Sequence, residues 1–121
     1  AKERYPRRKF ILFNGLNLPF ADESFDLVIC IAVFHHLPSE ELRQVFLKEI
    51  KRVLKKEGKL VLTVWYLWKK IQFWRLFFKY TLLKILQKSQ LDFFDVYFPW
   101  QKRYQRYLHA FNKNELKKEA E

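Results

Sequence analysis

Two adjacent histidines, His35 and His36, are the residues of this chain best placed to do chemistry. They follow a nearly continuous apolar run over residues 25–33, which predicts a parallel strand buried on both faces. Open α/β sheets bind their ligands beyond the carboxyl ends of such strands. An imidazole there can orient a substrate or act as a general base; a solvated loop histidine or a helix-capping one is the alternative.

The elements that must position these histidines form a strand–helix–strand pattern. Ser39 can cap a helix whose last turn carries Lys55 and Lys56, with Gly58 as the residue just beyond its end. Residues 59–66 form a second buried strand. Two strands joined by a helix through short links predict a right-handed βαβ crossover.

The segments on either side of this unit are read from their turn residues. Residues 9–13 form a short apolar run closed by the turn pair Asn14 and Gly15, and we expect a strand there. Residues 67–88 mix apolar and aromatic side chains with lysine and arginine, which predicts a long basic amphipathic helix. Pro99 is expected to break the following loop or strand, and Asn112 or Asn114 to cap a final helix.

The composition indicates an anionic partner. The 121 residues include 24 Lys and Arg against 13 Asp and Glu, for a formal net charge of +11. Nucleic acid, an acidic membrane surface and an acidic substrate all fit that charge. A single cysteine excludes a disulfide within the chain and suggests the reducing cytoplasm. No metal site is expected from three scattered histidines, and no signal peptide or membrane-spanning segment is recognisable.

Three segments resemble, in order and spacing, the class I S-adenosylmethionine (SAM)-dependent methyltransferases, in particular the methyltransferase type 11 domain: residues 14–20, 25–37 and 49–60. In the third segment, Lys56 and Glu57 replace the family's usual Pro and Gly. The resemblance implies an α/β fold, a partial Rossmann-like arrangement with a βαβ core and a long amphipathic helical insertion. It would lack the N-terminal strands and the last two strands.

The resemblance also implies SAM as the cofactor. Asn14 would take the family position that binds the adenine amine, since its side-chain oxygen is an acceptor. The residues expected to bind the cofactor are Asn14, Gly15, Leu16, Cys30, Ile31 and Ala32. His35 and His36 become the expected catalytic residues, more by orienting the substrate than as bases, because methyl transfer from a sulfonium needs mainly positioning.

Residues 95–111 indicate which methyltransferases the chain resembles most. Residues 95–100 and 106–111 are similar to signatures of the tRNA wobble-uridine carboxymethyl methyltransferases, which esterify the carboxylate of a modified uridine in the anticodon loop. The residues expected to bind this substrate are Pro99, Trp100, Arg103, Arg106, Tyr107 and His109. Arginine can pair with phosphate or carboxylate, and aromatic rings can stack an unpaired base. The alternatives are a structural Pro-Trp turn and a solvated strand.

Four roles remain open for residues 67–88. They are a cap over the substrate, a membrane-surface helix, a docking helix for the small activator protein that this family uses, and a core-packed insertion, which we favour. Function has alternatives as well. A methyltransferase acting on quinones or lipids is the runner-up, and a non-catalytic RNA- or membrane-binding fragment is the third hypothesis. A membrane surface ranks below the anticodon loop as a partner.

The family's glycine-rich SAM loop has no match, because the only glycines are Gly15 and Gly58. The acidic ribose-binding residue has no match either. We therefore expect a middle-to-late portion of a methyltransferase domain that by itself binds SAM weakly. Its parts would be a central sheet portion (1–66), the helical insertion (67–91) and a substrate-side segment (92–121).

Overall fold

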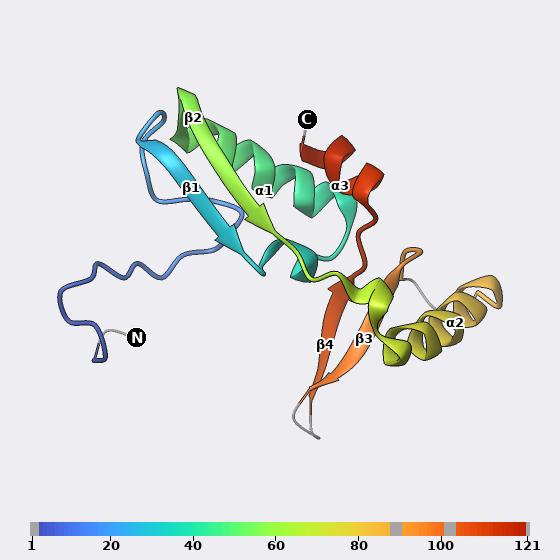
Figure 1. Cartoon of the computed structure of the whole chain (residues 1–121). Coiled ribbons are helices and arrows are strands. Elements are labelled where there is room, and N and C mark those ends of the chain that lie inside the picture. Colours follow the sequence, from blue (N-terminus) through green and yellow to red (C-terminus); the bar gives the residue numbers. More distant parts are fainter. Residues whose placement is uncertain (1–2, 88–90, 101–103, 121) are drawn as a thin grey trace.

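The computed structural model describes residues 3–87, 91–100 and 104–120 (Figure 1). Two small sheets, each of two strands, organise the chain. The elements are β1 (Phe25–Ile31), η1 (Phe34–His36), α1 (Glu40–Val53), β2 (Leu54–Thr63), η2 (Leu67–Lys69), α2 (Ile71–Ile85), β3 (Asp95–Trp100), β4 (Tyr104–His109) and α3 (Lys113–Ala120).

The first sheet confirms the predicted βαβ crossover. β1 and β2 are parallel and in register from Leu27 opposite Lys59 to Ile31 opposite Thr63. Helix α1 connects them and lies against one face of the pair (Figure 1). Its N-cap is Ser39, as expected, whose Oγ accepts the N–H of Leu42 at 3.4 Å. The α/β class is therefore present in the fold.

The end of α1 differs from the prediction. The helix stops at Val53, and Lys55, Lys56 and Gly58 belong to β2. The register between the strands shifts between Phe25 and Leu27, so that the start of β2 bulges. Gly58 is needed because of close approach, since a Cβ there would lie 2.9 Å from the Lys55 carbonyl oxygen. It is not a helix cap.

Two expectations for the apolar runs are wrong. Residues 9–13 are not a strand; they form an irregular exposed segment in which Leu12 is wholly exposed. β1 is not buried on both faces. Cys30 points into the core with α1, whereas Leu27, Ile29 and Ile31 alternate on the other face and are about half to two-thirds exposed (49%, 57% and 66%). Continuous hydrophobicity does not reveal which face of a strand has a neighbour.

The second sheet is an antiparallel hairpin of β3 and β4. Pro99 does not break β3 but lies inside it, opposite Gln105. A two-stranded sheet has only edge strands, where the missing N–H of proline is tolerated. The expected helix at 67–88 is present as the short η2 followed by α2, which packs on β3. The last helix begins after Asn112, whose Oδ1 accepts the N–H of Glu115 at 2.9 Å.

Two apolar clusters hold these units. Phe34, Phe46, Ile50, Val53 and Phe111 belong to the cluster under the first sheet. The second cluster joins η2, α2 and the hairpin through Leu67, Phe73, Val96, Leu108 and Ala110. In the described part of the chain, no helix is long and apolar enough to cross a membrane.

Phe73 and Phe78 of α2 provide a matched test of this packing. Phe73 is fully buried, and its replacement by Ala is expected to lower the free energy of unfolding by about 3–5 kcal/mol. Phe78 is 65% exposed, so Phe78→Ala should change it by roughly 0.5 kcal/mol or less. Urea unfolding followed by circular dichroism measures both values. Equal losses would contradict the packing of α2 on the hairpin.

Candidate functional site

The loop that carries the first predicted cofactor residues is clamped to α1 by two side chains. The Leu18 N–H donates to Glu49 Oε2 at 2.9 Å, and Arg52 donates to the carbonyl oxygens of Leu18 and Phe20 at 3.0 and 2.8 Å. Arg52 also pairs with Glu49 and with Asp22, at 2.9 and 2.7 Å. Hydrogen bonds from Arg52 and from the Leu18 N–H hold the pKa of Glu49 at about 2.

The sequence analysis missed this clamp, although a signal was present. Glu49 and Arg52 are three residues apart on a helix, a spacing at which side chains are neighbours. Both therefore project from the same face of α1. What could not be read from the spacing is that the loop at residues 18–22 would fold back over this face.

The loop itself turns at Asn14. The Leu16 N–H donates to Asn14 Oδ1 at 2.9 Å, which makes a local side-chain turn. One lone pair of Oδ1 and the Leu16 N–H are thereby used within the loop. Gly15 lines a groove beside this turn. Contact of Asn14, Gly15 or Leu16 with adenine stays a prediction.

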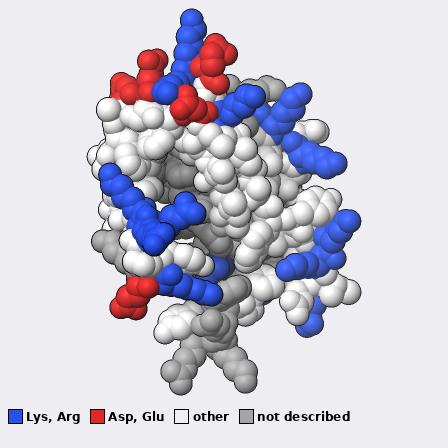
Figure 2. Space-filling view, turned by 60° about the vertical axis from the view of Figure 1, so that its left-hand side comes forward, with Lys and Arg blue, Asp and Glu red and all other residues white. Residues whose placement is uncertain are grey.

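An open apolar groove of about 720 Å³ brings Gly15, Cys30 and Ile31 together. It follows β1 along the strand edge that does not pair with β2. Figure 2, in which the left-hand side of Figure 1 comes forward, shows a broad uncharged area with charged side chains of both signs at its margins. Burial raises the pKa of the Cys30 thiol, so this cysteine behaves as a small apolar side chain.

The groove suits part of SAM and not the rest. Its apolar walls match a purine ring, but within the described part of the chain no charged side chain lines it. The ammonium and carboxylate of the methionine portion and the ribose hydroxyls thus find no partner among its lining residues. A groove along a free strand edge also suits a further strand, because unpaired backbone groups border it.

Ala32 follows the last residue of β1 and turns the chain toward the histidines. Its backbone φ is 54°, in the left-handed region that side chains with a Cβ rarely adopt. Its N–H is shared between the carbonyl and hydroxyl oxygens of Thr63, each at 3.1 Å. This hydrogen bonding holds the turn, and the short η1 helix that follows carries His35 and His36.

The two histidines have different surroundings. His35 is fully buried, its ring lies 5.0 Å from that of Trp65, and its Nδ1 accepts the Trp65 N–H at 3.4 Å. Burial, followed by the nearby charges of His36 and Arg106, lowers the pKa of His35 to about 4. The neutral ring therefore carries its proton on Nε2, a buried atom with no hydrogen-bond partner among the described groups.

His36 connects the end of β1 to the hairpin. Its Nδ1 lies 2.9 Å from the Tyr107 carbonyl oxygen, which can only accept, so Nδ1 carries the proton. The structure thus brings the predicted catalytic pair beside β4, which carries Arg106 and Tyr107. Both groups of residues were predicted, but from separate motifs; their meeting was not.

The remaining predicted substrate residues are more dispersed. Pro99 lies with Arg75 and Lys79 in a hollow between α2 and β3. Trp100 is described here only by its backbone pairing with Tyr104, and Arg103 lies outside the described residues. Binding of tRNA by these positions stays a prediction.

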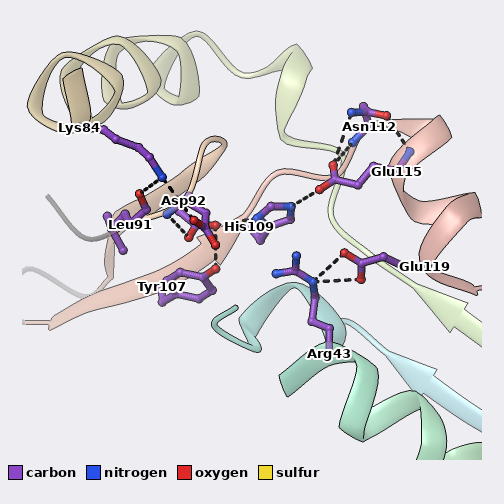
Figure 3. A network of polar contacts seen from close by, with 10 residues as sticks. Arg43, Lys84, Leu91, Asp92, Tyr107, His109, Asn112, Glu115 and Glu119 are labelled. Atoms are coloured by element: carbon purple, nitrogen blue, oxygen red, sulfur yellow. Dashed lines mark hydrogen bonds and ion pairs between the residues drawn. The ribbon is translucent and has the colours of Figure 1, made fainter. Parts of the chain in front are cut away.

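His109 is the centre of a buried polar network that joins β3, β4 and α3 (Figure 3). Its Nδ1 lies 2.6 Å from Asp95 Oδ1, and its Nε2 lies 2.8 Å from Glu115 Oε1. Two carboxylates cannot donate when ionised, so both ring nitrogens carry protons. Burial opposes this charge, but the hydrogen bonds that His109 donates to Asp95 and Glu115 prevail and raise the pKa of His109. The Tyr107 hydroxyl also donates to Asp95, at 2.7 Å.

A second buried ion pair lies next to this network. The Nε atom of Arg43 donates to both carboxylate oxygens of Glu119, at 2.9 and 3.0 Å, which ties α1 to α3 (Figure 3). Sequence reasoning missed Arg43, Asp95, Glu115 and Glu119. Only Glu115 had a local signal, because Asn112 and Glu115 have the spacing of a capping box. Among the described residues, no group of three or more His, Cys, Asp or Glu side chains could hold a metal ion.

Comparison with known proteins gives a family for the first half of the chain. Residues 1–62 match the model of a family described as "Methyltransferase domain". A putative methyltransferase of Encephalitozoon cuniculi is 54% identical over 50 residues, which are 41% of this chain and 24% of that protein. The human probable tRNA methyltransferase 9B is 46% identical over 52 residues, 43% of this chain and 12% of that protein.

Two further matches are informative. The tRNA (carboxymethyluridine(34)-5-O)-methyltransferase of Arabidopsis thaliana is 38% identical over 58 residues, which are 48% of this chain and 14% of that protein. The crystal structure of the PH0226 protein from Pyrococcus horikoshii has a TM-score of 0.66 at 25% identity, covering 99% of this chain and 52% of that one. The chain spans at most about a quarter of the length of these curated relatives.

The Glu49–Arg52 clamp should weaken in acid. Because the folded pKa of Glu49, about 2, lies below its ordinary value, the stabilisation is complete above about pH 4.5 and is lost as the pH falls toward 2. Glu49→Gln should lower the melting temperature at pH 7 and flatten this acid dependence. Glu57→Gln, at an exposed carboxylate of β2, is the control and should do neither. An unchanged melting temperature for Glu49→Gln would contradict the clamp.

The two buried histidines should give a stability maximum near pH 6.5. Below it, His35 stays neutral in the fold while the unfolded chain binds a proton, so stability falls from pH 6.5 toward 4. Above it, the raised pKa of His109 keeps its proton in the fold, and stability falls as the pH rises through that pKa. His109→Gln should remove the alkaline decline and leave the acid one, as measured by urea unfolding at several pH values. Loss of the acid decline instead would refute this assignment.

Proposed function

The chain belongs to the methyltransferase domain family, and from this membership we propose that it takes part in SAM-dependent methyl transfer to the carboxylate of a modified wobble uridine in a tRNA anticodon loop. The observation that carries the proposal is the contact of His36 with the Tyr107 backbone. It places the loop after β1, which the family model includes, beside the hairpin whose signatures resemble tRNA carboxymethyl methyltransferases. Support also comes from the relative so named in Arabidopsis thaliana.

Two groups of residues would contribute to the reaction, one at the cofactor and one at the methyl acceptor. Gly15 would border the adenine part of SAM, and Cys30 and Ile31 would form an apolar floor beside its methionine part. When bound, SAM supplies a methyl group on a sulfonium. A carboxylate acceptor is its own nucleophile, so no residue here has to remove a proton. Arg106 would bind the acceptor carboxylate or a neighbouring phosphate through its guanidinium.

The state of the histidines agrees with a positioning role. With its pKa lowered to about 4, His35 is neutral at pH 7 and offers an N–H donor on Nε2. That nitrogen is buried, so it does not reach a substrate in this conformation, and His35 contacts the backbone through Nδ1, which accepts the Trp65 N–H. While His36 Nδ1 donates to the Tyr107 carbonyl oxygen, its Nε2 carries a lone pair that can accept a hydrogen bond. His36 would therefore orient the substrate by accepting from a hydroxyl or N–H group of the nucleoside rather than by binding the carboxylate.

The methyl product tests the proposal. The full-length protein containing this chain, given labelled SAM and tRNA carrying 5-carboxymethyluridine, should form a methyl ester, which mild alkali cleaves to methanol. Arg106→Ala should weaken tRNA binding and reduce the slope of log affinity against log salt by about 1. Lys48→Ala, at an exposed lysine of α1, is the matched control. Alkali-stable methylation, or equal effects of the two variants, would contradict this function.

The chain alone is expected to bind SAM weakly, because none of the described residues that line its groove offers a charged partner for the methionine portion. Isothermal titration with the 121-residue chain measures this directly. Submicromolar binding would overturn this expectation while leaving the substrate proposal intact.

A methyltransferase acting on quinones or lipids is the second candidate. The observation in its favour is the exposed apolar side of α2, where Ile71 and Ile85 are 80% and 67% exposed. Labelled methyl groups recovered in an organic extract, and absent from tRNA, would favour this candidate over the first.

A further inference from the structure

Helix α2 has two apolar faces, and only one of them is covered. Phe73, with Phe77 and Tyr80, packs against the hairpin. The other face, which we name the α2 stripe, is exposed, and α2 itself lies at the periphery of the molecule (Figure 1). The α2 stripe consists of Ile71, Trp74, Phe78, Leu82 and Ile85, with exposed fractions of 80%, 38%, 65%, 58% and 67%.

The spacing of the α2 stripe makes it continuous. Its members follow one another at intervals of three or four residues, so they line one side of the helix over its whole length. A row of bulky side chains of this length is more than the scattered exposed apolar residues of an ordinary surface. The sequence expectation of a core-packed insertion therefore holds for half of α2 only.

Positive charge borders the α2 stripe. Arg75 and Lys79 are exposed, lie one turn apart and, with Gln72, Phe98 and Pro99, line a hollow of about 510 Å³ between α2 and β3. The sequence of α2 contains no acidic residue. Any partner of this side therefore meets apolar side chains and cations together.

The combination of exposed apolar side chains and cations distinguishes among three candidate partners. A second copy of the chain would bring Arg75 and Lys79 close to their own equivalents, which like-charge repulsion disfavours. RNA would pair with the two cations and could stack a base on an aromatic side chain, but it would leave the aliphatic side chains in water. An anionic lipid surface satisfies both, because its acyl region accepts the apolar side chains and its phosphates meet the cations.

We propose that the α2 stripe docks the protein on the surface of an anionic lipid membrane. The helix would lie in the plane of the interface, because its 15 residues extend roughly 22 Å, less than the ~30 Å of a bilayer's hydrocarbon core. Trp74 and Phe78 would enter the boundary between headgroups and acyl chains, and Arg75 and Lys79 would bind headgroup phosphates. This docking site is independent of the proposed methyl transfer.

Vesicle sedimentation tests the proposal on the full chain. Vesicles of phosphatidylcholine with phosphatidylserine should bind the protein, pure phosphatidylcholine should bind it much less, and salt should weaken the binding. Ile71→Glu and Phe78→Glu should each reduce binding by about tenfold or more. Leu12→Glu is the control, since it makes the same change at a fully exposed position outside α2.

The design separates loss of binding from loss of folding. Ile71→Glu adds an acid to the first turn of α2, where the helix dipole favours it, so this variant should keep its circular dichroism spectrum. The double variant Arg75→Gln, Lys79→Gln should retain the fold and lose most of the salt dependence.

Three results would overturn the proposal. One is no sedimentation with anionic vesicles. The second is equal loss of vesicle binding in Leu12→Glu and Ile71→Glu. The third is binding of another macromolecule by the α2 stripe in place of vesicles. Loss of affinity for an anticodon stem-loop in the double variant would identify RNA as the partner. Dissociation of a dimer by Ile71→Glu would identify a second copy of the chain.

Discussion

The parallel pairing of β1 and β2 through α1 is the constraint on which the rest of the structure depends. Helix α1 ends at Val53 and β2 begins at Leu54, so no linker residue can absorb a change in position. One face of α1 must then cover the sheet, while Glu49 and Arg52 face the loop at residues 18–22. The same pairing places Ala32 against Thr63 and so determines where the histidines emerge.

The hairpin joins this unit through buried polar groups rather than through a continuous sheet. His36 holds the Tyr107 carbonyl, His109 bridges Asp95 and Glu115, and a separate ion pair joins Arg43 to Glu119. Buried charges are costly unless each one has a partner with good geometry, and each of these has one. Such contacts tolerate few alternative arrangements, which is why they orient the hairpin more strictly than apolar packing alone would.

Two apolar surfaces remain open for different physical reasons. The groove along β1 borders unpaired backbone groups and suits either a flat ring or another strand. The α2 stripe lies on a helix, whose backbone groups are paired, and carries cations beside it. The proposed cofactor contact concerns the first surface and the proposed membrane contact concerns the second, so the two proposals do not depend on each other.

The sequence by itself determined the family resemblance and part of the local structure. Apolar periodicity and polar capping residues predicted the βαβ unit, the amphipathic helix and the final helix, because these depend on neighbours in the chain. Only the tertiary structure decided that β1 has one bare face, that Pro99 lies within a strand and that His109 sits between two carboxylates. Each of these features depends on residues that folding brings together from distant segments. The residue pattern of one segment does not show which other segment packs against it.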